Sequence, residues 1–161
     1  KPGSIAQKLR RRNLEVSVKS IKENLYDIAG IRVVCSFADD IYDIAEVLKS
    51  QDDVEVIQIK DYIKNPKPNG YSSYHIIIKV PIYLYDVKEL IPIELQIRTI
   101  AMDFWASLEH KMKYKKSFDE APQIIKQLKE CADSINEIDK KMLDIRKNIE
   151  NMNISQDNSH Y

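Results

Sequence analysis

The segment from Lys67 to His75 holds the side chains best suited to binding a nucleotide. Its sequence, KPNGYSSYH, begins with a loop that offers Lys67 and Asn69 and continues into a predicted strand. Because strand side chains alternate between two faces, Tyr71 and His75 are expected on the same face. An aromatic plane can stack on a base, while lysine and histidine can contact phosphates. The alternative is an exposed hairpin whose tyrosine packs on a neighbour.

Two acids stand at the edge of, or within, predicted buried strands. Asp27 directly precedes one strand, and Glu94 lies inside another. A carboxylate in such a place is costly unless it is paired or bound to a metal. Two of them on adjacent strands would suit Mg²⁺, which takes oxygen ligands and substrate phosphates. Arg32 offers the alternative of a simple ion pair, and Gln96 shares a strand face with Glu94.

The first predicted helix carries polar groups in one row. Ser4, Lys8 and Arg11 recur at positions i, i+4 and i+7, so they share a face. A hydroxyl, an ammonium and a guanidinium in a row would form a track for phosphates. The alternative is an ordinary solvated helix face.

Hydrophobic periodicity and turn signals predict the elements that must position these residues. We expect helices at residues 4–14, 18–25, 39–50 and 99–114, strands at 30–37, 54–61, 71–80 and 90–98, and a loop at 64–70. This order indicates an α+β fold on a mixed, largely antiparallel sheet flanked by helices.

A second periodic stretch follows the predicted domain. Nine apolar positions there alternate spacings of four and three. They are Ile124, Leu128, Cys131, Ile135, Ile138, Met142, Ile145, Ile149 and Met152, which we call the heptad seam. A stripe this narrow predicts a long helix packed on another helix. That partner is either the helix's own domain or, in an oligomer, a second copy.

Composition excludes several classes of protein. The 161 residues include 25 Lys and Arg against 25 Asp and Glu, which argues against a globally basic nucleic-acid binder and against an acidic disordered tail. Cys35 and Cys131 lie in apolar patterns that predict buried free thiols rather than a disulfide framework. No apolar run reaches the ~18 residues of a membrane span. We therefore expect a soluble cytoplasmic protein that does not bind membranes.

Four segments, in this order and spacing, carry a family resemblance: SIAQKLRR, DIAGIR, KPNGYSSYH and ELQIRT. From about Ser4 to Lys115 the chain resembles the synthetase domain of the RelA/SpoT family, and it is most similar to the stand-alone small alarmone synthetases. The resemblance implies a nucleotidyltransferase-like sheet. It also implies Mg²⁺-dependent transfer of the β,γ-pyrophosphate of ATP to the 3′-hydroxyl of GTP or GDP, which makes pppGpp or ppGpp.

The resemblance also implies roles for single residues. The ATP phosphates would be bound by Ser4, Lys8, Arg11 and Arg32. The GTP site would be formed by Lys67, Asn69, Tyr71, His75 and Gln96, with Tyr71 stacked on guanine. Asp27 and Glu94 would hold Mg²⁺, and Glu94 would also take the proton from the attacking hydroxyl. By spacing, an Arg and a Lys that begin the family's first motif would fall before residue 1.

The resemblance, the heptad seam and the polar C-terminus together divide the chain into a synthetase domain at 1–116, a helical oligomerisation element at 117–154 and a disordered tail at 155–161. The heptad seam predicts a homo-oligomer, and the family resemblance favours a tetramer. The family's hydrolase module needs a histidine-aspartate metal motif that this sequence lacks, so we expect synthesis only. The alternative is a catalytically vestigial regulatory oligomer that binds guanine nucleotide or single-stranded RNA. The presence of both Asp27 and Glu94 favours the enzyme, because a base-stacking module needs neither.

Overall fold

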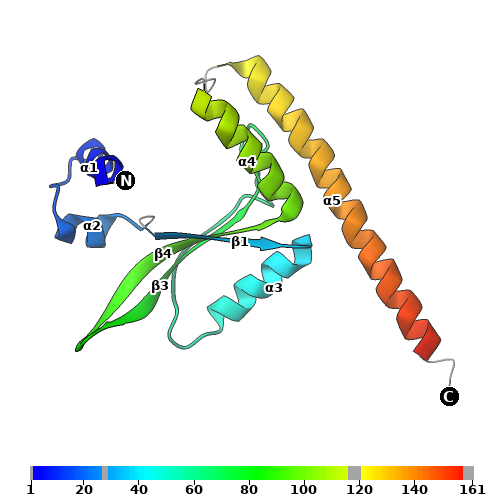
Figure 1. Ribbon diagram of the computed structural model, residues 1–161, viewed down its shortest axis with the longest axis horizontal. Coiled ribbons are helices and arrows are strands. Elements are labelled where there is room, and N and C mark those ends of the chain that lie inside the picture. The colour runs from blue at the N-terminus through cyan, green and yellow to red at the C-terminus, as the bar shows by residue number, and fades with distance from the viewer. Residues whose placement is uncertain (1, 27–28, 116–120, 158–161) are drawn as a thin grey trace. The chain divides into compact units, whose positions relative to one another are not determined.

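The computed structural model describes residues 2–26, 29–115 and 121–157, which form helices and a sheet (Figure 1). In chain order the elements are α1 (Pro2–Arg11), α2 (Val18–Asn24), β1 (Ala29–Cys35), α3 (Ala38–Lys49), β2 (Glu55–Asp61), β3 (Tyr74–Leu84), β4 (Val87–Thr99), α4 (Ile100–Lys115) and α5 (Pro122–Asp157). The strand order within the four-stranded, largely antiparallel sheet is β1-β4-β3-β2. The predicted α+β class is confirmed.

The sequence left open whether residues 81–88 lie in the strands β3 and β4 or between them, and most of them lie in the strands. The two strands extend through residues 81–84 and 87–89 and leave only Tyr85 and Asp86 to connect them. Tyr85 takes a positive φ of 51°, as the tight connection of a twisted hairpin requires. At its other end, β3 begins at Tyr74, three residues later than predicted.

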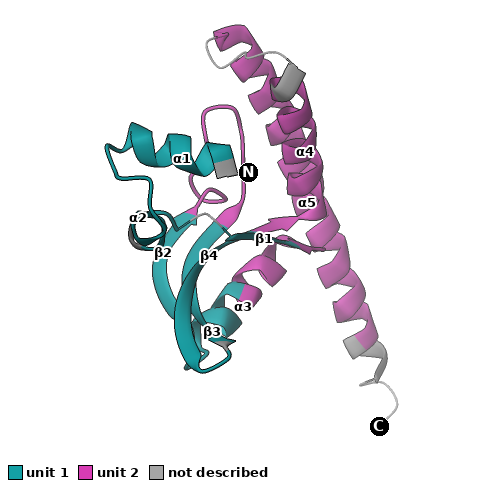
Figure 2. Cartoon of the chain, turned by 60° about the vertical axis from the view of Figure 1, so that its left-hand side comes forward, with its two compact units in different colours: residues 1–33, 45–60, 75–96 teal, residues 34–44, 61–74, 97–161 magenta. Residues whose placement is uncertain are grey.

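The chain divides into two compact units (Figure 2). Unit 1 comprises residues 1–33, 45–60 and 75–96, and unit 2 comprises residues 34–44, 61–74 and 97–161. Each is described separately below.

In unit 1 the two short N-terminal helices pack on each other. Leu9 and Leu25 are almost fully buried there. The hydroxyl of Ser17 caps α2 by accepting a hydrogen bond from the Ser20 backbone N–H at 3.1 Å. Arg12 donates to the carbonyl of Asn24 at 2.7 Å, which ties the turn after α1 to the end of α2.

In unit 2 helix α5 packs along α4 (Figure 1). Trp105, Ala106, Leu128 and Ala132 form the buried cluster between the two helices. The indole N–H of Trp105 donates to the carbonyl of Leu128 at 3.1 Å, so the aromatic ring is fixed by a polar bond as well as by packing.

The heptad seam is partly covered in its first half, where Ile124 and Cys131 are exposed, and exposed throughout its second half. Leu128 is buried and Ile135 is half-buried against α4. The later positions are 50–65% exposed, namely Ile138, Met142, Ile145, Ile149 and Met152. The fold-back interpretation therefore holds for Leu128 and Ile135 of the first half. The second half of the seam is exposed to solvent.

The prediction that Cys131 is buried was wrong. Cys35 is buried as expected, whereas Cys131 is exposed. The buried stripe of α5 passes through Leu128, Ala132 and Ile135. Cys131 immediately precedes Ala132, a buried member of this stripe, and its own side chain is exposed. Helix α5 runs to Asp157, into the segment predicted as a disordered tail, and residues 158–161 lie outside the described residues.

Candidate active site

A carboxylate on β4 and an imidazole on β3 form the most distinctive polar contact of unit 1. Nδ1 of His75 lies 3.0 Å from Oε1 of Glu94. The amide nitrogen of Gln96 donates to the other oxygen of Glu94 at 3.4 Å. His75 is buried, and the Glu94 side chain is 19% exposed. The carboxylate is therefore oriented from two sides while part of it still faces solvent.

This arrangement suits a general base. A base must be held within hydrogen-bond reach of the proton that it removes, so the position of a candidate base is the first criterion and its pKa the second. Because Leu95 points into the buried side of β4, Glu94 and Gln96 point to the other side, as the strand alternation predicted. The structure brings His75 to Glu94. The GTP-binding role assigned to His75 stays a prediction.

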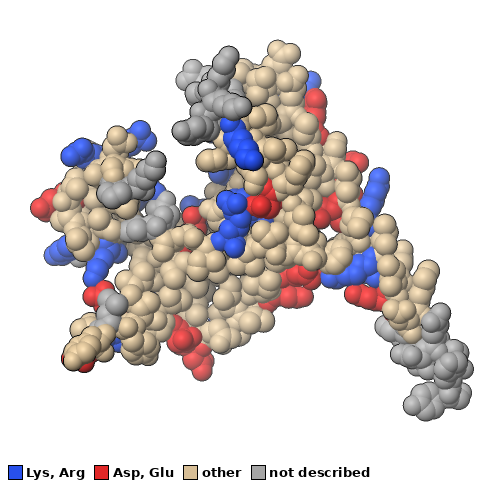
Figure 3. All heavy atoms as spheres, viewed as in Figure 1, with Lys and Arg blue, Asp and Glu red and all other residues tan. Residues whose placement is uncertain are grey.

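The row of polar groups on α1 exists as predicted. Ser4 and Arg11 are exposed and Lys8 is half-buried on this ten-residue helix. On the face shown in Figure 3, basic side chains surround the surface formed by α1 and α2. Arg32 is exposed on β1. All four predicted phosphate-binding residues therefore belong to unit 1, where they would supply positive charge and a hydroxyl for a polyanion.

Tyr71 belongs to unit 2 and lies in a cluster of aromatic rings and cations. Its ring packs edge-on against Tyr62 and Trp105, with centroids 5.9 and 6.5 Å apart. The ammonium of Lys67 lies over the Tyr71 ring at 4.6 Å and over the Tyr62 ring at 4.9 Å. The two predicted GTP ligands Lys67 and Tyr71 are thus brought together by a cation–π contact.

Asn69 and Gly70 shape the loop before Tyr71. The side-chain oxygen of Asn69 accepts a hydrogen bond from the Tyr71 N–H at 3.1 Å, and its amide donates to Glu109 at 3.3 Å. Gly70 has a φ of 89°. A Cβ added at Gly70 would lie 2.4 Å from Cβ of Ala132. Only glycine allows this loop to approach α5 so closely.

Sequence reasoning missed Arg98 as a site residue. It is 4% exposed and donates to the Tyr71 hydroxyl at 2.7 Å. An arginine within the largely apolar segment LQIRTIAM could have identified it. A charge in a buried strand requires a specific partner, so such an arginine predicts a defined polar contact.

The described part of the site is compatible with Mg²⁺. Asp27 lies outside the described residues, and among residues 2–26, 29–115 and 121–157 no three His, Cys, Asp or Glu side chains gather as a metal cluster. Glu94 presents a partly exposed carboxylate. Mg²⁺ at nucleotide sites commonly uses one or two carboxylates and completes its shell with phosphates and water. A carboxylate of this kind fits that ion.

None of the described helices is both long enough and apolar enough to cross a membrane.

Comparison with known proteins gives consistent matches. Residues 1–119 match the family model described as the region found in RelA/SpoT proteins. The GTP pyrophosphokinase YwaC of Bacillus subtilis (strain 168) is 49% identical over 147 residues, which cover 91% of this chain and 70% of that protein. The GTP pyrophosphokinase YjbM of the same organism is 35% identical over 143 residues, which cover 89% of this chain and 66% of that protein.

Two solved structures extend the match to three dimensions. The small alarmone synthetase 2 from Bacillus subtilis superposes with a TM-score of 0.80 at 49% identity, over 91% of this chain and 76% of that one. The small alarmone synthetase 1 from Bacillus subtilis, bound to its product pppGpp, gives a TM-score of 0.80 at 34% identity, over 91% of this chain and 74% of that one.

Proposed function

The chain belongs to the RelA/SpoT family, and we propose that it is a GTP pyrophosphokinase that makes pppGpp from ATP and GTP, or ppGpp from ATP and GDP. The observation that carries the proposal is the Glu94 carboxylate, held by His75 and Gln96 on a strand of the family's own fold. The product bound to the related synthetase 1 supports the same substrate class.

The proposed chemistry is an in-line transfer to the acceptor ribose. Glu94 takes the proton from the 3′-hydroxyl of GTP, whose oxygen then attacks the β-phosphorus of ATP. The new bond joins the 3′-oxygen to that phosphorus. The bond between the β-phosphorus and the oxygen bridging to the α-phosphate breaks, and AMP leaves. His75 and Gln96 keep the carboxylate oriented for the proton transfer.

Most of the catalysis in such a transfer comes from positioning and charge neutralisation. Ser4, Lys8, Arg11 and Arg32 would bind the ATP phosphates. Asp27 and Glu94 would hold Mg²⁺, which supplies further charge neutralisation at the phosphates.

For the acceptor nucleotide we propose that guanine stacks on the ring of Tyr71. Lys67 now lies over that ring, so a stacked base would take its place and leave the ammonium to the phosphates. Asn69 holds the loop through its bond to the Tyr71 N–H. The family resemblance assigns His75 and Gln96 to the same nucleotide.

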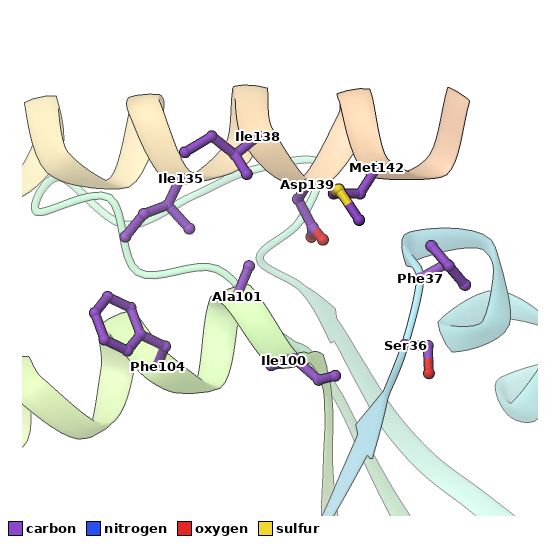
Figure 4. Close-up of a pocket in the computed structure, with 9 residues that line it drawn as sticks. All are labelled: Ser36, Phe37, Ile100, Ala101, Phe104, Ile135, Ile138, Asp139 and Met142. Carbon is purple, nitrogen blue, oxygen red and sulfur yellow. The ribbon is translucent and has the colours of Figure 1, made fainter. Parts of the chain in front are cut away.

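We also propose that the exposed half of the heptad seam binds a second copy of α5. A cavity of about 510 Å³ lies where this half begins. Figure 4 shows Ile138 and Met142 of α5 facing Ile100 and Phe104 of α4 across it. These four apolar side chains are 51–63% exposed. Burying such a stripe against an identical helix is the usual solution for a heptad pattern, and the family resemblance favours a tetramer.

The direct test of the activity is product formation. Purified protein is incubated with ATP, GTP and Mg²⁺, and the nucleotides are separated by anion exchange. We expect a guanosine pentaphosphate and AMP in equal amounts, and a tetraphosphate when GDP replaces GTP. Glu94→Gln serves as the matched inactive control. A protein that binds both nucleotides but forms neither product would instead be the vestigial regulatory binder.

A further inference from the structure

Arg98 is a buried charge with three polar partners. Its Nη1 pairs with Oδ1 of Asp103 at 3.1 Å, its Nη2 donates to the Tyr71 hydroxyl at 2.7 Å, and its Nε donates to Oγ of Ser73 at 3.3 Å. The Arg98 side chain is 5% exposed. A guanidinium withdrawn so far from water is tolerated only when such bonds replace its hydration.

These bonds connect Tyr71 to a strand end. Tyr71 precedes β3, whose first residue is Tyr74, so regular strand pairing does not fix its side chain. Arg98 lies near the end of β4. Ser73 adds a second link, because its hydroxyl accepts from Arg98 and donates to the carbonyl of Ile97 at 3.3 Å.

Other contacts hold the backbone and the ring of Tyr71. Asn69 accepts from the Tyr71 N–H, and the ammonium of Lys67 and the guanidinium of Arg98 lie over the ring at 4.6 and 5.2 Å. Tyr62 and Trp105 meet the ring edge-on, at interplanar angles of 70° and 61°. The hydroxyl bond to Arg98 fixes the far end of the side chain. To these ring contacts the Arg98 bond adds a charged hydrogen bond, which is stronger than a neutral one.

We propose that Arg98 is a positioning residue for the acceptor nucleotide: it holds the plane of Tyr71 in the orientation on which the guanine base stacks. This inference rests on the proposed function, in which Tyr71 carries that base. Asp103, in the first turn of α4, is the counter-ion that keeps Arg98 in place. A pre-oriented plane reduces the ordering that the base must impose on binding.

The proposal predicts a selective kinetic effect. Loss of the bond between Arg98 and Tyr71 raises KM for GTP and leaves KM for ATP within about twofold. A hydrogen bond to a charged group is typically worth about tenfold in affinity, so a tenfold rise in KM for GTP is the expected size. A general loss of folding would change kcat and both KM values together.

The first variant is Tyr71→Phe, which keeps the ring and its packing but removes the hydroxyl. The second is Arg98→Lys, which keeps the charge but cannot bond Tyr71, Ser73 and Asp103 at once. Both single variants and the double variant are assayed for KM of each nucleotide. We expect each single change to raise KM for GTP about tenfold and the double change to add no more than about twofold.

Arg146→Lys is the matched control. Arg146 also pairs with carboxylates of unit 2, Asp39 and Asp40, but it contacts none of the proposed nucleotide ligands in the described residues. KM for GTP should stay within about twofold in this variant.

Three results would overturn the proposal. Tyr71→Phe with a wild-type KM for GTP would show that the hydroxyl bond is irrelevant. Additive effects of the two changes would mean that the hydroxyl contacts the nucleotide directly. Equal rises in both KM values would assign Arg98 to the fold alone. Failure of the proposed function looks different, because the wild-type protein would then make no pentaphosphate at all.

Discussion

The hydroxyl of Thr99 donates a hydrogen bond of 2.7 Å to Oδ2 of Asp139. The same oxygen of Thr99 accepts from the Met102 N–H at 3.1 Å, so one buried side chain both caps α4 and attaches it to α5. Burial raises the pKa of Asp139, and the bond from Thr99 opposes this in part. The ionised carboxylate is therefore held at an energetic cost beside the apolar cavity.

A pH dependence of stability follows from this contact. The folded-state pKa of Asp139 is raised above its ordinary 3.8, so its stabilising contribution is full below that pH and is lost as pH rises through the raised pKa. In Asp139→Asn the amide oxygen can still accept the hydrogen bond from Thr99. Because the amide does not ionise, the variant does not lose this stability as pH rises. We expect urea unfolding to show that the free energy of unfolding of the variant increases relative to that of the wild type as pH rises through the raised pKa of Asp139. For the control Asp144→Asn, at an exposed position, the free energy of unfolding should depend on pH as in the wild type. The same pH dependence in Asp139→Asn would refute the raised pKa of Asp139.

Replacement of Glu94 tests the proposed base. Glu94→Gln keeps the shape that His75 and Gln96 contact, but an amide cannot accept the proton of the 3′-hydroxyl. Loss of a general base typically costs ~10²- to 10⁴-fold in rate. We expect kcat to fall by this amount while calorimetry still detects binding of ATP and of GTP. Turnover within about threefold of the wild type would remove Glu94 from the proton transfer.

Removal of the Tyr71 ring tests the base platform. Stacking of a base on an aromatic side chain is worth ~1 to 3 kcal/mol, so Tyr71→Ala should raise KM for GTP by roughly five- to 150-fold and change KM for ATP much less. The exposed Tyr83→Ala controls for loss of a tyrosine elsewhere. Equal effects on both substrates would make Tyr71 a packing residue beside Trp105.

The sequence allowed prediction of relations that follow from local repetition. Glu94 and Gln96 were expected on one strand face, and the amide of Gln96 does reach the Glu94 carboxylate. The row on α1 and the period of α5 follow from helical repetition in the same way. The class of fold followed from the order of these elements, and it is confirmed.

Relations between distant residues could not be obtained from spacing. The contact of His75 with Glu94 joins residues 19 apart, and that of Arg98 with Tyr71 joins residues 27 apart. The loop at Tyr71 also departs from the predicted strand. The Tyr71 carbonyl accepts from the Lys67 N–H, and the Ser73 carbonyl accepts from the Tyr62 N–H. These backbone bonds satisfy residues 71–73 outside β3, and no side-chain pattern encodes them.

Gly70 should be required for the contact between its loop and α5. Gly70→Ala places a Cβ 2.4 Å from Cβ of Ala132 and 3.2 Å from Cα of Lys129, at a φ of 89°. We expect a loss of about 2 to 4 kcal/mol in the free energy of unfolding, from the clash and from the strained backbone. Adding Ala132→Gly should relieve the clash with the Ala132 side chain but not the backbone strain. The stability of the double variant should therefore lie between those of Gly70→Ala and the wild type. A single variant as stable as the wild type would contradict this geometry.

Ile138 tests whether the open half of the heptad seam is an interface. Its side chain is 58% exposed in one chain, so a monomer would tolerate Ile138→Asp with little change. In an oligomer the same change buries an unpaired charge, at a cost of several kcal/mol. We expect light scattering to show an oligomer for the wild type and smaller species for the variant at equal concentration. Lys141→Asp, at an exposed polar position of α5, should leave the mass unchanged. A monomeric wild type would mean that α5 has no partner helix beyond α4 in solution.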